Sequence, residues 1–244
     1  MIESIANNFE IIADAVYEKG IEKGKENEHS KFWDTYQDYG NRTSYANGFQ
    51  GNMGWTKDNF YPKYDIKPVG NAIQLLYAWE YADKHTMDLS ARLKECGVVL
   101  DTSQATNLTH AFAYVRFATI PPIDLTGLTA NASLLFGDSR TIKTIEKIIM
   151  AETTPIATTW FRNDIALENL TIEGTIGQSN FNVKDCKKLT KASLLSILKA
   201  LSLNITATTT ITFSTAHQTT IETDPDCKPY YDAAKAAGWS IVYA

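Results

Sequence analysis

The sequence predicts an α/β repeat protein in which a short solenoid follows a helical segment and is closed by an α/β cap. Three observations support this fold class. Apolar residues with helical spacing open the chain, phenylalanines recur at a nearly constant interval in its middle, and alternating helix and strand patterns close it. The chain has 244 residues, of which 44% are hydrophobic and 21% charged, so it is large enough to bury a core of this kind.

The first element is an amino-terminal helix, predicted by apolar residues that follow one another at steps of three and four: Ile2, Ile5, Phe9, Ile12 and Val16. This spacing is typical of a coiled coil, and bulky residues at both contact positions favour trimers or larger assemblies over dimers. We therefore expect residues 1–40 to form a helical segment for docking or oligomerisation. The alternative is an amphipathic helix that lies on its own domain.

The predicted solenoid spans residues 41–189 and begins with a segment rich in aromatic residues, glycine and asparagine. Glycine and asparagine supply the positive φ angles of tight turns, so loops and short strands are expected there. Aromatic side chains of this density either cap the open end of a core or form a surface on which a ligand stacks. Six aromatic residues are candidates for ligand binding, and each has the core as its alternative: Trp55, Tyr61, Tyr64, Trp79, Tyr81 and Trp160.

The repeat is carried by Phe112, Phe136 and Phe161, which lie at almost equal intervals along the chain. After each phenylalanine come a polar loop and a group of apolar residues. The interval falls within the range of about 20–29 residues that leucine-rich repeats use. One such unit cannot bury its apolar edge alone, and stacked units join their edges into a continuous core. The expected core residues are Phe112, Ile120, Phe136, Ile145, Phe161 and Leu170.

Residues 190–244 are predicted to form the α/β cap that shields the last unit. Thr190 is a favourable N-cap, and the residues after it carry an apolar stripe with helical spacing. Isoleucine alternates with threonine in the next segment, as in a half-buried strand. The predicted elements are a helix over 88–96 and a strand over 98–100 within the repeats, then a helix over 191–201, a strand over 205–213, a helix over 228–237 and a strand over 239–243.

Charge and hydropathy argue against two classes of partner. The net charge is −5 and the pI about 5.4, whereas proteins that bind nucleic acids usually display a concentrated basic face. No apolar run reaches the roughly 18–20 residues that cross a bilayer. The acidic start of the chain does not resemble a signal peptide. We therefore expect a protein that is made in the cytoplasm, without nucleic-acid binding or membrane insertion.

No motif for catalysis or for a cofactor is present in the sequence. The three cysteines and four histidines are scattered, which favours reduced, buried thiols over a disulfide framework or a metal site. Asp164, Glu168 and Glu173 lie close together in one repeat, and two carboxylates are what glycoside cleavage needs. Solvated loop charges are the simpler interpretation. The expectation is a protein that is not an enzyme and that has no cofactor, no metal and no catalytic residues.

Several ordered segments resemble one family. They are residues 32–43 (FWDTYQDYGNRT), 62–66 (PKYDI), 97–103 (GVVLDTS), 167–177 (LENLTIEGTIG) and 189–193 (LTKAS). Together they look like BspA-like leucine-rich-repeat proteins that phages and prophages of gut Firmicutes encode, often near tail genes. The resemblance implies a right-handed β-solenoid with a helical attachment segment. It also implies a place in the tail tip, baseplate or fibre of a virion and a role in host adsorption.

The resulting hypothesis is a non-enzymatic phage virion protein of the tail region that contributes to recognition of the host surface. Its partners would be other virion proteins or copies of itself, reached through the amino-terminal helix, and a glycan or protein of the host cell. Two alternatives are a purely structural virion part, such as a collar, decoration or spacer, and a bacterial surface adhesin of leucine-rich-repeat type. A tail enzyme that cleaves glycans is a further alternative, and the absence of a motif argues against it.

Overall fold

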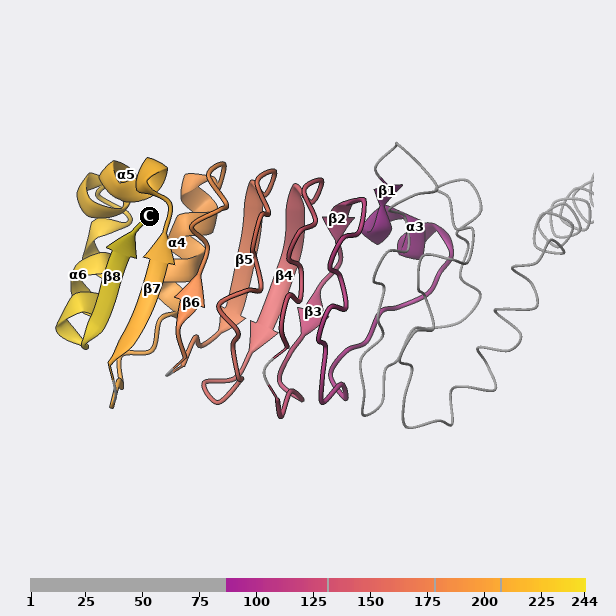
Figure 1. Cartoon of the computed structure of the whole chain (residues 1–244), viewed down its shortest axis with the longest axis horizontal. Helices are drawn as coiled ribbons and strands as arrows, with labels where there is room; N and C mark the ends of the chain where they lie inside the picture. The colour runs from indigo at the N-terminus through magenta and orange to yellow at the C-terminus, as the bar shows by residue number, and fades with distance from the viewer. Residues whose placement is uncertain (1–86, 131, 178, 207) are drawn as a thin grey trace, which may run out of the picture.

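A computed structural model describes residues 87–130, 132–177, 179–206 and 208–244 (Figure 1). The predicted amino-terminal helix, with Ile2, Ile5, Phe9, Ile12 and Val16, lies outside the described residues. So does the segment that holds five of the aromatic candidates: Trp55, Tyr61, Tyr64, Trp79 and Tyr81. The described residues cover most of the repeat region from Met87 onward and most of the carboxy-terminal region.

Parallel strands stacked at a regular interval make the first sheet. Its five strands are β1 (Met87–Asp88), β2 (Phe117–Ile120), β3 (Ile123–Asp124), β4 (Thr144–Met150) and β5 (Asn169–Gly174). Both β2 and β3 pair with β4. They are two strands rather than one because Pro121 and Pro122 lie between β2 and β3, and proline has no N–H to give to a strand ladder. The register places Thr119 of β2 beside Thr144 of β4, and Thr144 beside Asn169 of β5. Each step along the sheet therefore advances the chain by the same interval.

The predicted repeat core is buried. Ile120, Ile145 and Leu170 follow one another in register across β2, β4 and β5, and each is at most 2% exposed. The period of the phenylalanines thus correctly indicated which side chains point inward. All six expected core residues lie in one continuous cluster: Phe112, Ile120, Phe136, Ile145, Phe161 and Leu170.

Opposite the strands, the three phenylalanines mark a stack of turns. The rings of Phe112 and Phe136 are 5.6 Å apart and those of Phe136 and Phe161 are 5.4 Å apart, both stacked. The second residue after each phenylalanine has a positive φ: Tyr114 at 58°, Asp138 at 62° and Asn163 at 60°. The turns also bond to one another through the backbone, as from Phe136 N to Trp160 O at 3.0 Å. We call this side of the core the turn side and the opposite side the strand side.

A helix occupies the next place on the strand side. Helix α4 (Lys191–Ala200) is capped by Thr190, whose side chain accepts from Ser193 N. The Ser193 hydroxyl accepts from Leu170 N at 2.9 Å and donates to Glu168 O at 3.0 Å. Ser196 accepts from Ile172 N at 2.9 Å in the same way. Serine side chains thus satisfy the backbone edge of β5, where a further strand would otherwise pair.

The strands that follow lie on the turn side. The second sheet is parallel and contains β6 (Phe181–Asn182), β7 (Thr209–Phe213) and β8 (Trp239–Tyr243), and its register aligns Phe181, Ile211 and Ile241. Phe181 of β6 meets the ring of Phe161 edge-on at 5.7 Å, which continues the line of phenylalanine turns. The other elements described are α3 (Leu89–Glu95), η2 (Thr215–His217), α5 (Gln218–Thr223) and α6 (Lys228–Ala236). Figure 1 shows the strands side by side along the long axis, with α5 and α6 at the carboxy-terminal end.

The predicted fold class, a leucine-rich-repeat-like right-handed solenoid, is wrong. The described residues form an α/β fold of two curled parallel sheets with few helices. A uniform repeat would place every strand on the same side of the core, whereas here α4 takes over the strand side and β6–β8 take over the turn side. The strand pair β6–β7 also crosses the predicted domain boundary between residues 189 and 190. The regular interval of the phenylalanines reports stacking, and stacking alone does not specify the fold class.

Candidate functional site

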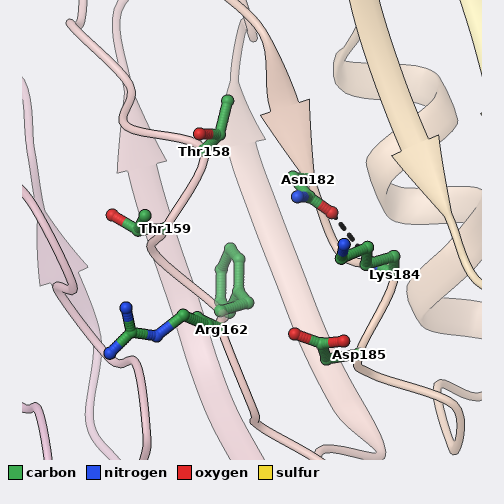
Figure 2. A pocket seen from close by; sticks show the side chains of 7 residues that line it. Thr158, Thr159, Arg162, Asn182, Lys184 and Asp185 are labelled. Carbon is green, nitrogen blue, oxygen red and sulfur yellow. Dashed lines mark hydrogen bonds between the residues drawn. The ribbon is translucent and has the colours of Figure 1, made fainter.

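A pocket opens on the turn side at the place where turns give way to strands. It has a volume of about 210 Å³, and we call it the turn pocket. Its lining comes from the turn that contains Phe161, from β6 and from the loop after β6. The lining residues are Thr158, Thr159, Phe161, Arg162, Asn182, Lys184 and Asp185. Figure 2 shows Thr158 and Thr159 on one side, Asn182, Lys184 and Asp185 on the other, and Arg162 directed away from Lys184.

The wall formed by the turn is held by the turn before it. Thr159 accepts a hydrogen bond from Leu134 N at 3.1 Å, and Arg162 O accepts one from Asp138 N at 2.6 Å. Phe161, 1% exposed, anchors the wall in the core. Because these bonds join the turn that contains Phe161 to the turn before it, they also fix the backbone that carries Thr158 beside the pocket.

The opposite wall is held by two side chains. Asn182 accepts from Lys184 N at 3.0 Å, which forms a tight turn directly after β6. Asp185 Oδ2 accepts from Asn163 N at 2.9 Å and so ties this loop to the turn that contains Phe161. Both walls of the pocket are therefore fixed by hydrogen bonds.

Arg162 is neutralised next to the pocket. It forms an ion pair with Asp138, which also accepts from the Asn163 amide. Burial opposes the charged form of Asp138, but the hydrogen bonds from Asn163 and Arg162 and the charge of Arg162 outweigh it and hold the pKa of this carboxyl below its usual value. The guanidinium is thus committed to a structural ion pair.

Three polar groups of the turn pocket have no partner among the described residues. They are the Thr158 hydroxyl, the Asn182 amide nitrogen and the Lys184 ammonium, for which the described residues offer no hydrogen bond or ion pair. Lys184 is exposed and carries the one cation of the lining that is not committed to a neighbour within the described ranges. A hydroxyl, an amide donor and an ammonium facing one space can bind a ligand that presents oxygen acceptors.

A buried polar group supports the same turns from inside. The Ser139 hydroxyl donates to Phe112 O at 2.6 Å, and Ser139 N donates to Asp164 Oδ1 at 3.2 Å. Asp164 is 1% exposed, so the interpretation of this residue as a solvated loop charge is wrong. Burial raises the pKa of its carboxyl well above the usual value, and the charges of Asp138 and Asp185 add to the shift. Asp164 Oδ2 and Trp160 Nε1 have no hydrogen-bond partner among the described residues.

The remaining sequence candidates do not gather into a second site. Trp160 is 1% exposed and belongs to the core, the alternative that the sequence left open for this residue, so its ring is not available to a ligand. Glu173 is exposed and pairs with Lys147 at 2.5 Å, so it is no member of a buried acid pair. In the described ranges, no group of three or more His, Cys, Asp or Glu side chains could hold a metal ion. Cys186 and Cys227 are buried free thiols.

Sequence reasoning missed the turn pocket because it searched for aromatic residues. The signal that could have found it is the pair Thr158–Thr159 directly before a repeat phenylalanine, together with the Asx turn Asn182–Lys184 one unit later. That the two segments face each other depends on the change from turns to strands, which the sequence period does not reveal. No helix of the described part is long and apolar enough to span a membrane.

Comparison of the chain with protein-family models, with curated proteins and with solved structures gives no match. The interpretation of the turn pocket therefore depends on its own chemistry.

Proposed function

We propose that this chain is a non-enzymatic binding protein of the tail region of a phage particle and that it contacts the host-cell surface through the turn pocket. The observation that carries the binding role is the set of three polar groups on rigid walls that lack a partner among the described residues: Thr158, Asn182 and Lys184. Polar groups that converge on one cavity from walls fixed by hydrogen bonds are typical of a ligand site.

The chemistry of the lining favours binding over cleavage. Asp185 is the one carboxylate among the residues that line the turn pocket, and its Oδ2 already accepts from Asn163 N. Glycoside cleavage generally uses two carboxyl groups that face each other across the scissile bond. A lining with one committed acid and several hydrogen-bonding groups suits reversible recognition of a polar surface component.

The location in a virion is supported by the resemblance to phage-encoded, tail-region proteins. In this proposal, residues 1–40 attach the chain to other virion proteins or to copies of itself, and the described region faces the host. A bacterial adhesin would differ from this proposal in its location, on the cell surface instead of in a virion. A purely structural virion part would differ in that other virion proteins would cover the turn pocket.

The test measures binding of the full chain to envelopes of the bacterium that carries the gene. Thr158→Val removes the pocket hydroxyl with little change in shape, and Thr153→Val makes the same change at an exposed position outside the pocket. We expect Thr158→Val to weaken binding about fivefold or more, the cost of one lost hydrogen bond, and Thr153→Val to leave it unchanged.

Immunogold labelling of induced particles accompanies the binding assay. Label at the tail supports the proposal, and particles without label contradict the location in a virion. Equal binding by both threonine variants would contradict the role of the turn pocket. Release of sugars from the envelopes would contradict a non-enzymatic function.

A further inference from the structure

We propose that the turn pocket recognises an anionic polysaccharide, with Lys184 pairing with a carboxylate or phosphate oxygen of the polymer. This inference depends on the proposed binding function and adds the chemical class of the ligand.

The charges of the pocket lining favour an anion. Two of the lining residues are cations and one is an anion: Arg162, Lys184 and Asp185. Arg162 is already paired with Asp138, and Asp185 is held by Asn163 N. The Lys184 ammonium is therefore the available charge, since no ion pair to it exists in the described part of the chain. An ammonium of this kind pairs with carboxylate and phosphate oxygens.

The uncharged groups favour a sugar. The Thr158 hydroxyl can donate and accept, and the Asn182 amide nitrogen donates. Both lie beside the pocket with Lys184, so one ligand can meet all three (Figure 2). Sugar hydroxyl and ring oxygens match such donors and acceptors. The aromatic ring at the pocket, that of Phe161, is buried and stacked on Phe136, so recognition here relies on hydrogen bonds rather than on ring stacking.

The net charge of the whole chain predicts how the affinity for an anionic polymer depends on salt. At −5 the protein repels a polyanion at long range, so attraction has to come from the pocket itself. One ion pair at the pocket gives a weak dependence of affinity on salt, unlike the steep dependence of a protein with an extended basic face.

The experiment uses the full chain and three immobilised polymers: poly(glycerol phosphate), polygalacturonate and neutral dextran. Lys184→Gln removes the pocket cation, and Lys188→Gln removes an exposed lysine that does not line the pocket. We expect one or both anionic polymers to bind more tightly than dextran. Lys184→Gln should weaken this binding about tenfold and remove its salt dependence, whereas Lys188→Gln should keep both.

The two anionic polymers identify the source of the anion. Binding to poly(glycerol phosphate) alone assigns a phosphodiester polymer, and binding to polygalacturonate alone assigns an acidic sugar. Equal affinity for dextran, or equal binding by Lys184→Gln and the wild type, would overturn the inference. If the chain binds envelopes but none of these polymers, the anionic class is wrong and the proposed function stands. If it binds neither, the proposed function fails as well.

Discussion

The carboxyl group of Asp164 lies between two turns, where Ser139 N donates to one of its oxygens and the other has no partner among the described residues. Its pKa is raised by burial and by the charges of Asp138 and Asp185. An unfolded aspartate has a pKa of about 3.9, so this group contributes stability below that pH and the contribution is lost as the pH rises toward the folded pKa. Asp164 therefore lowers the stability of the fold at neutral pH relative to acidic pH.

Replacing Asp164 by Asn should remove this pH dependence. The amide oxygen can still accept from Ser139 N, and the group no longer ionises. We expect the free energy of unfolding to rise by more than about 1 kcal/mol at pH 7 and to change little at pH 4. Urea titrations at both pH values measure the effect. Asp232→Asn, at an exposed residue paired with Lys228, is the control. The same pH slope in wild type and Asp164→Asn would contradict this account.

The sequence predicted much at the residue scale but not the pocket. The period of the phenylalanines identified buried residues such as Ile145 and Leu170, because burial follows directly from periodic apolar side chains. Asp164 was expected in solvent, since a charged residue type is seldom buried. Trp160 was a candidate for an exposed contact and proved to be core. Residue type indicates an average environment, from which buried Asp164 departs, whereas burial is usual for a tryptophan such as Trp160.

At the scale of the elements, local signals predicted three of the four expected elements of the carboxy-terminal region closely, whereas the strand predicted over 205–213 begins only at Thr209. The structure has α4 at Lys191–Ala200, α6 at Lys228–Ala236 and β8 at Trp239–Tyr243, within one residue of the expected bounds. Thr190 is the N-cap that the sequence indicated. The predicted strand over 98–100 is reduced to a single bridge residue at Leu100, and α5 was not predicted. Caps and apolar stripes are local, whereas the side of the core on which a strand lies depends on partners far along the chain.

The loops that follow β4 and β5 contact each other closely, and Gly177 is one of several glycines at which a side chain would meet neighbouring backbone. A Cβ atom at Gly177 would overlap the backbone oxygen of Glu152, whereas one at Gly97 meets nothing within 4 Å. We expect Gly177→Ala to cost more than about 3 kcal/mol, because the backbones of the loops after β4 and β5 would have to separate. Gly97→Ala should cost about 1 kcal/mol, since only its φ of 65° is unfavourable for alanine. Thermal and urea unfolding of both variants measure the difference. Equal losses would show that the loops after β4 and β5 do not pack as described.

At the scale of the whole molecule, the turn pocket is a product of the change from turns to strands. Fewer residues separate two paired strand positions on the strand side, where Thr144 pairs with Asn169, than on the turn side, where Phe181 pairs with Ile211. The turn at 158–163 is the last before this change, and β6 is the first strand after it. The interval of the phenylalanines predicted a uniform stack, and a uniform stack has no such junction. The sequence could therefore predict the core but not the site.

Hydrogen exchange of the full chain, with and without host envelopes, tests the central claim most directly. The account predicts slower exchange at the amides of residues 158–163 and 182–185 when envelopes are present, and the same exchange as before along β4. The two walls of the turn pocket should respond together, because one ligand bridges them. Protection confined to the exposed face of β4 and β5, with the turn pocket unchanged, would contradict the account and move the binding surface to the strand side.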